Sequence, residues 1–420
     1  MPEKKSLRVQ GVLKTLGPGI LYAGAAIGAS HLVQSTRAGA LYGFRLIWIV
    51  LLINLFKYPF FEFAYRYTAA TGEHMLAGYR KLGRWVIITF FCLMIGTGIV
   101  NVAAIIIVTS GLTCLFFHIH LDPFLASSIL LTIILIMLLI GRYALLDRIM
   151  KVMIALLSLL TIITLVLALQ KNAPVPPGFT APPVWDHVGI AFLIALMGWM
   201  PTPIEASVFP SLWALERSKQ TRYRPKFREY LVDFHVGYIG SAIMAVIFLS
   251  LGAVVMFGSG LTFSDSTIPF SKQIVSVYSK TLGSWSFPVI AAIAMLTMFS
   301  TALTVIDAYP RTLEASLQQL FPKINQHHRR FYWLWAVGLS LSAIFIIGFL
   351  SSSMKRLLDF ATIVSFLAAP VFAFLNYKVV TSKLIRENSR PGRWLRLLGI
   401  IGILFLSGFS LIYLYSRIFL

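Results

Sequence analysis

The sequence has little charge and very little negative charge. Of its 420 residues only 12% are charged and 15 are acidic, whereas 58% are hydrophobic and the mean hydropathy is +0.82. A water-soluble domain of this length cannot cover so many apolar side chains with so few polar ones. The composition therefore excludes a soluble enzyme and predicts a membrane protein.

Cysteines and nucleotide-binding motifs are also scarce. Cys92 and Cys114 lie in one apolar stretch, which fits neither a disulfide framework nor a zinc site. The chain has no phosphate-binding loop, nucleotide-binding glycine motif or catalytic triad pattern. We therefore expect no enzyme, no cofactor and no ATP-driven pump, but a carrier driven by a gradient.

Basic residues are abundant in comparison, with 36 Lys and Arg and a net charge of +21. Such an excess can indicate nucleic-acid binding. Here, however, the basic residues cluster in short segments between apolar runs, as they do in the loops of membrane proteins. We expect a lipid bilayer as the partner and no nucleic acid.

Apolar runs of about twenty residues, the length that crosses a bilayer core, recur along the whole chain. We predict eleven spans, near residues 17–40, 46–66, 86–116, 123–141, 149–169, 188–213, 234–257, 284–307, 331–350, 358–377 and 397–417. No connecting loop is long enough to form a soluble domain. Residues 1–420 therefore form a single transmembrane domain, and we expect it to function as a monomer.

The basic residues also predict the orientation of the chain. A cytoplasmic N-terminus places most of them, including the loop Arg217–Arg228, on the cytoplasmic side. An odd number of spans then puts the C-terminus outside. The expected location is the cell (inner) membrane. Lys57 and Glu62, within the second span, are expected to lie near the membrane edge and extend toward water.

Two spans contain residues that weaken helices. The first has the small residues Gly24 to Ser30 followed by His31, and the sixth has Pro201 and Pro203, which remove two backbone donors. Broken helices at membrane depth are tolerated where they line a cavity. Breaks five spans apart predict two inverted repeats, 17–169 and 188–377, with 397–417 as an extra span and the substrate between the breaks.

At these positions the chain resembles the NRAMP family of divalent-metal transporters. The resemblance covers most of the chain and is carried by Gly17-Pro18-Gly19, Ser30-His31, Arg37-Ala38-Gly39-Ala40, Thr71-Gly72, Gly111 and Ser300-Thr301. It implies an all-α membrane protein with the LeuT-like fold, in which inverted five-helix repeats are followed by an eleventh transmembrane helix.

The family's diagnostic motifs are changed. Its metal-binding Asp-Pro-Gly-Asn corresponds to Gly28-Ala29-Ser30-His31, and we align its Met-Pro-His-Asn with Thr202-Pro203-Ile204-Glu205. The acidic pair that the family uses for proton release corresponds to Asn101 and Ala104. The resemblance therefore implies a distant branch with a remade site.

Hydrogen-bond donors remain where the family's carboxylate is lost. We expect the substrate site to comprise Gly28, Ser30, His31, Thr202 and Pro203, where hydroxyls, an imidazole and free N–H groups at helix restarts favour an anion. The leading prediction is therefore transport of a small oxyanion such as bicarbonate.

The alternative is transport of a divalent metal ion, Mn, Fe or Mg, for which coupling to protons stays open. His31 and Glu205 would then be the metal ligands, since imidazole and carboxylate together suit such ions. Glu205 and Asn101 are the candidate coupling residues, because a carboxylate at membrane depth can carry a proton.

Overall fold

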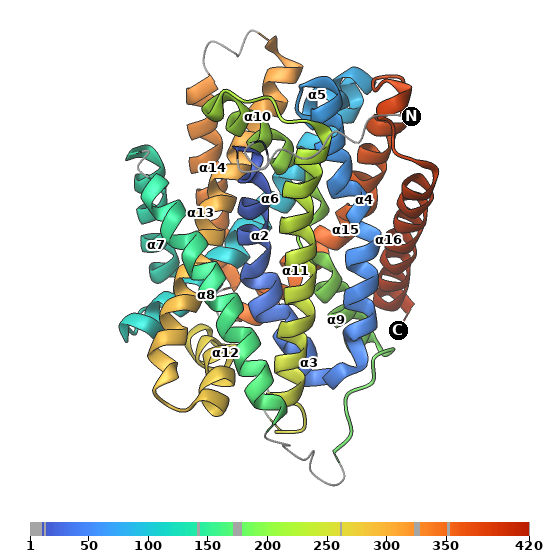
Figure 1. Ribbon diagram of the computed structural model, residues 1–420. Helices are drawn as coiled ribbons and strands as arrows, with labels where there is room; N and C mark the ends of the chain where they lie inside the picture. Colours follow the sequence, from blue (N-terminus) through green and yellow to red (C-terminus); the bar gives the residue numbers. More distant parts are fainter. Residues whose placement is uncertain are drawn as a thin grey trace.

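The computed structural model describes residues 11, 14–140, 143–170, 179–260, 263–322, 328–350 and 353–419, and these residues form helices and connecting loops without a strand. The basic N-terminal residues Lys4, Lys5 and Arg8 lie outside the described part. Figure 1 shows a bundle of long helices that run between the two ends of the molecule. An all-α protein, as predicted, is confirmed.

The first half of the bundle contains α2 (Pro18–Ala26), η1 (Ile27–Ser35), α3 (Thr36–Tyr42), η2 (Gly43–Leu46), α4 (Ile47–Thr71), α5 (Met75–Leu82), α6 (Arg84–Phe117), α7 (Pro123–Ile140) and α8 (Tyr143–Leu169). The second half contains α9 (His187–Gly198), η3 (Ile204–Val208), α10 (Phe209–Thr221), α11 (Phe227–Met256), α12 (Thr267–Leu282), α13 (Ser286–Leu320), α14 (His328–Leu350), α15 (Met354–Thr381) and α16 (Arg393–Phe419).

All eleven predicted spans fall on helices. Within the described residues, eight helical stretches are long and apolar enough to cross a membrane, and the first two spans count as one stretch of 54 residues. The fifth span corresponds to a shorter apolar helix, Ala155–Leu169, and the sixth is interrupted after His187–Gly198. Two short helices at opposite ends of the bundle, α5 and α12, are not among the predicted spans (Figure 1).

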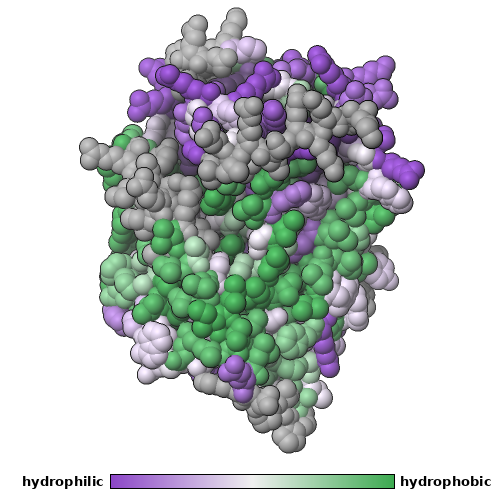
Figure 2. Space-filling model, viewed as in Figure 1, coloured by the Kyte–Doolittle hydropathy of each residue, from purple (hydrophilic) through white to green (hydrophobic). Residues whose placement is uncertain are grey.

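The outside of the bundle is apolar around its middle. Leu139 on α7, Leu341 on α14 and Leu404 on α16 are each more than half exposed. Figure 2 shows a hydrophobic body, with hydrophilic residues gathered at the end of the molecule where Figure 1 places α5 and α10. Side chains of this kind are stable in contact with lipid, so the chain is a multi-pass membrane protein.

The two longest helices, α6 and α13, pack against each other in the interior. The split first span, α2 to α3, packs along α11, and glycines permit two close approaches: a Cβ atom on Gly19 would lie 1.9 Å from the carbonyl oxygen of Asp233, and one on Gly39 would lie 1.9 Å from that of Leu249. The repeat boundaries at 17–169 and 188–377 stay a prediction.

Candidate functional site

The first span breaks where the sequence predicted. Gly28 has φ −73° and ψ −121°, outside the helical range, between α2 and α3. A Cβ atom on Gly28 would lie 2.3 Å from Thr301 Oγ1 of α13. Gly28 therefore lets the broken segment approach α13, a position that the family's larger aspartate could not take in this packing.

The sixth span breaks as well. Helix α9 ends at Gly198, the chain turns through Pro201 and Pro203, and the helix resumes with η3 and α10. Ser30 Oγ lies 3.0 Å from the carbonyl oxygen of Pro201, so that the two breaks are in direct contact. The predicted meeting of the first and sixth spans is present in the structure.

A cavity of about 40 Å³ lies between the two breaks. Its polar lining residues are Ser30, Asn101, Trp199, Thr202, Thr301 and Tyr309, and Pro203 also lines it. A cavity of this size has room for a small ion with at most a few water molecules. Of the predicted substrate residues, the structure thus places Ser30, Thr202 and Pro203 at the cavity.

His31 does not line this cavity. Its Nε2 lies 2.8 Å from the carbonyl oxygen of Ser241 on α11, and its Nδ1 lies 2.6 Å from the carbonyl oxygen of Ala26. Both ring nitrogens therefore face backbone oxygens, and the side chain is fully buried. In this conformation His31 joins η1 to α11, and it is not open to a metal ion or an anion.

Glu205 lies directly behind the cavity wall. Its Oε1 accepts hydrogen bonds from Asn101 Nδ2 at 3.1 Å, Tyr309 OH at 3.4 Å and Ser365 Oγ at 3.5 Å. Its Oε2 is buried without a hydrogen-bond partner. The carboxylate thus retains one oxygen that can accept a proton or face a cation.

Asn101 and Glu205, the predicted coupling residues, are therefore in contact although they lie on α6 and η3. Asn101 Oδ1 also accepts hydrogen bonds from Trp199 Nε1 and Ser365 Oγ, each at 3.0 Å. The amide connects the sixth-span break to α15. The role of this pair in coupling stays a prediction.

Lys57 and Glu62 both differ from the expectation drawn from the sequence. The prediction that Lys57 extends toward water near the membrane edge is wrong, because the side chain is fully buried. Its Nζ donates hydrogen bonds to the carbonyl oxygens of Met197, Gly198 and Thr202 at 2.8, 2.9 and 3.1 Å. A lysine in the middle of an apolar span was the signal that could have identified it. Glu62 is also buried and pairs with Arg66 at 2.6 Å.

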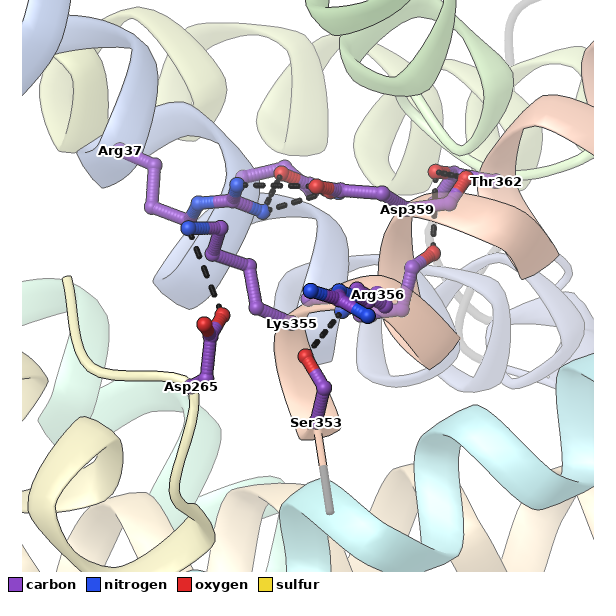
Figure 3. A network of polar contacts seen from close by, with 9 residues as sticks. Arg37, Asp265, Ser353, Lys355, Arg356, Asp359 and Thr362 are labelled. Atoms are coloured by element: carbon purple, nitrogen blue, oxygen red, sulfur yellow. Dashed lines mark hydrogen bonds and ion pairs between the residues drawn. The ribbon is translucent and has the colours of Figure 1, made fainter. Parts of the chain in front are cut away.

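A polar network joins α3 to α15 at the end of the bundle opposite α5 and α10 (Figure 3). Arg37 donates two hydrogen bonds to Asp359, at 2.7 and 3.1 Å, and one to Gln34 at 2.9 Å. Lys355 pairs with Asp265 at 3.5 Å in the same region. These contacts hold the second half of the broken first span against α15.

The structure offers few of the side chains that usually bind metal ions. Within the described part of the chain, no group of three or more His, Cys, Asp or Glu side chains is placed to hold a metal ion. A metal ion in the cavity would depend on hydroxyl, amide and backbone oxygens together with Glu205. Such oxygen ligands suit hard cations such as magnesium and manganese.

A second register exists for the sixth-span motif. Met200-Pro201 repeats the first two residues of Met-Pro-His-Asn two positions before Thr202-Pro203, within the turn that follows α9. In this register Met200 corresponds to the family's sulfur ligand, Thr202 to its histidine, and Glu205 falls outside the motif. The dipeptide itself was the missed signal. Met200 is fully buried, but it is not among the residues that line the cavity.

Comparisons with known proteins agree with this architecture. Residues 19–416 match the family described as natural resistance-associated macrophage protein-like, or NRAMP. An uncharacterised protein of Pasteurella multocida is 36% identical over 403 residues, which cover 95% of this chain and 91% of that relative.

Solved structures are similar over nearly the whole chain. A manganese transporter of Eremococcus coleocola, in complex with an aromatic bis-isothiourea compound, has a TM-score of 0.74 at 15% identity and covers 99% of this chain and 89% of its own. MhsT in complex with L-phenylalanine has a TM-score of 0.63 at 13% identity, covering 99% and 100%. These likenesses confirm the LeuT-like fold, and the chain belongs to the NRAMP family of membrane transporters.

Proposed function

We propose that this protein is a secondary transporter of a small divalent metal ion, such as Mn²⁺ or Mg²⁺, that works by alternating access. Membership of the NRAMP family supports this substrate class, as does the structural likeness to a manganese transporter. The observation that carries the proposal is the small cavity between the two breaks, lined by Ser30, Asn101 and Thr202 and backed by Glu205.

The proposed site uses hard oxygen ligands. Ser30, Thr202 and Tyr309 offer hydroxyl oxygens at the cavity. Glu205 supplies the negative charge that the family's first-span aspartate would otherwise provide. His31, which we expected to be a ligand, positions η1 through Ser241 instead. In this proposal the oxyanion favoured by the sequence becomes the second candidate.

One observation favours that second candidate. The Lys57 ammonium brings a positive charge to the sixth-span break, and Gly28 brings no negative charge to the first. A fixed cation at this depth would favour an anionic substrate such as bicarbonate over a divalent cation. The experiment must therefore compare the two charge classes directly.

Uptake into proteoliposomes of the purified protein tests both candidates in parallel. Mn²⁺ and Mg²⁺ entry is followed with internal metal dyes, and bicarbonate entry with an internal pH dye. We expect saturable metal entry that Ser30→Ala and Thr202→Ala both reduce, with protein-free liposomes as the control. Bicarbonate-dependent alkalinisation without metal entry would replace the proposal by the second candidate, and entry of neither would contradict both.

We further propose that the Asn101–Glu205 pair carries protons coupled to metal movement, and that the N-terminus is cytoplasmic. The contact between the two side chains supports the first point. The hydrophilic end of the molecule supports the second, because it contains the basic segment Arg217–Arg228 at the end of α10, and basic loops remain in the cytoplasm (Figure 2). The protein is proposed to act as a monomer, because the cavity is formed within one chain.

A further inference from the structure

The break in the sixth span exposes backbone carbonyl oxygens inside the membrane. The last carbonyls of a helix lack intrahelical partners and carry the negative end of the helix dipole. At the end of α9 these oxygens belong to Met197 and Gly198, and the turn that follows adds the carbonyl of Thr202. In a bilayer each of them must find a donor or a cation.

Lys57 meets this requirement completely. An ammonium group has three donors and no acceptor, and Nζ makes three hydrogen bonds, one to each carbonyl, at 2.8 to 3.1 Å. The side chain reaches the break from α4, about ten residues into that helix, and is fully buried. Among the described residues no carboxylate forms a direct ion pair with Lys57; Glu205 interacts with it electrostatically from further away.

The arrangement of these oxygens is that of a cation site. Three carbonyl oxygens converge on one point without a carboxylate, which suits a weakly hydrated monovalent cation better than a divalent one. The end of α9 is also packed closely against α15, because a Cβ atom on Gly198 would lie 1.9 Å from the carbonyl oxygen of Thr362.

We propose that the carbonyls of Met197, Gly198 and Thr202 form a monovalent-cation site that the Lys57 ammonium occupies as a covalently attached ion. Removing the ammonium leaves a site that takes potassium, sodium or a small alkylammonium ion. The wild-type protein needs no free ion at this position, and separating α4 from the end of α9 requires breaking three charge-assisted hydrogen bonds. This inference does not depend on which substrate is transported.

The test is thermal unfolding of the purified full-length protein in detergent, with potassium, sodium, methylammonium or choline chloride at equal ionic strength. We expect the unfolding temperature of the wild type to be the same in all four salts. Lys57→Ala should unfold at lower temperature in choline and recover by ~5 °C or more with saturating potassium or methylammonium, because an ion that binds only the folded state stabilises it.

Two controls distinguish a specific site from general destabilisation. Ile53→Ala removes an equally buried side chain one turn away on α4, and its loss of stability should not depend on the cation. Lys81→Ala removes a lysine that pairs with Glu73 at the surface and should behave as the wild type.

A further variant of Lys57 tests the proposal independently of whether Lys57→Ala can be purified. Lys57→Met retains the apolar stem but takes the ammonium donor away from the carbonyls of Met197, Gly198 and Thr202. The Met197 oxygen keeps a backbone bond from Met200 N at 3.4 Å, whereas those of Gly198 and Thr202 lose the ammonium bond, so we expect the variant to be strongly destabilised in every salt. A Lys57→Met protein as stable as the wild type would overturn the proposal. So would a Lys57→Ala protein whose unfolding temperature is the same in choline and in the smaller cations.

Discussion

At the residue scale, the distinctive feature of the site is one carboxylate with one unpartnered oxygen. Glu205 is fully buried, bonded through Oε1 to Asn101 and Tyr309, while Oε2 is free of hydrogen bonds. If the substrate is a divalent cation, this is the negative charge nearest to the cavity among the residues that surround it. Glu205→Gln should therefore lower metal uptake into proteoliposomes roughly tenfold or more.

Glu216→Gln is the matched control for this substitution. Glu216 is an exposed carboxylate on α10 that pairs with Lys219 at 2.7 Å. It is not among the residues that line the cavity. We expect its metal uptake to equal that of the wild type. Undiminished uptake by Glu205→Gln would remove the carboxylate from the proposed site, whereas increased bicarbonate uptake by the same variant would favour the anion.

At the element scale, the split first span packs closely against α11, and this contact should contribute to the stability of the bundle. The backbones of α3 and α11 touch at Gly39, where a Cβ atom would lie 1.9 Å from the carbonyl oxygen of Leu249. Gly39→Ala must push these elements apart and should lower the free energy of unfolding by about 1–3 kcal/mol. The shift would be measured as a lower unfolding temperature in detergent.

The control for this prediction lies on α11 itself. A Cβ atom on Gly240 would meet nothing within 4 Å, so that Gly240→Ala changes helix propensity without a clash. We expect the second variant to be as stable as the wild type or more stable by up to ~1 kcal/mol. Equal behaviour of the two variants would show that the close approach of α3 to α11 does not limit stability.

At the scale of the whole molecule, the orientation in the membrane can be tested directly. Gln220, in the last turn of α10, and Ser259, in the turn after α11, are exposed at opposite ends of the bundle (Figure 1). In a chain whose Cys92 and Cys114 are replaced by serine, Ser259→Cys should react with a membrane-impermeant maleimide in intact cells. Gln220→Cys should react only after permeabilisation, because the basic loop that contains it is expected in the cytoplasm.

The reverse labelling pattern would contradict the proposed orientation, since it would place the basic loop outside. Reaction of both the Ser259→Cys and the Gln220→Cys variant with the maleimide after permeabilisation would show that both cysteines are accessible. Size-exclusion chromatography of the purified protein would test separately whether it is the expected monomer.

Local patterns in the sequence were sufficient to predict that the molecule is a membrane protein and where its spans lie. Hydropathy depends on composition within about twenty residues, and a proline disturbs the helix in which it lies. The eleven spans and the break at Pro201 and Pro203 could therefore be predicted without knowledge of any tertiary contact. So could the meeting of Ser30 with the sixth-span break, once the two breaks were recognised as corresponding positions.

The direction and partners of the polar side chains were decided only by the tertiary structure. Lys57 binds a carbonyl 140 residues away, Asn101 a carboxylate 104 residues away, and His31 a carbonyl 210 residues away. No local pattern specifies which way a polar side chain turns inside a bundle, because buried donors and acceptors must be satisfied by whichever helix packs beside them. For that reason the sequence identified the broken spans correctly, whereas packing turned His31 away from the cavity and brought Lys57 to its edge.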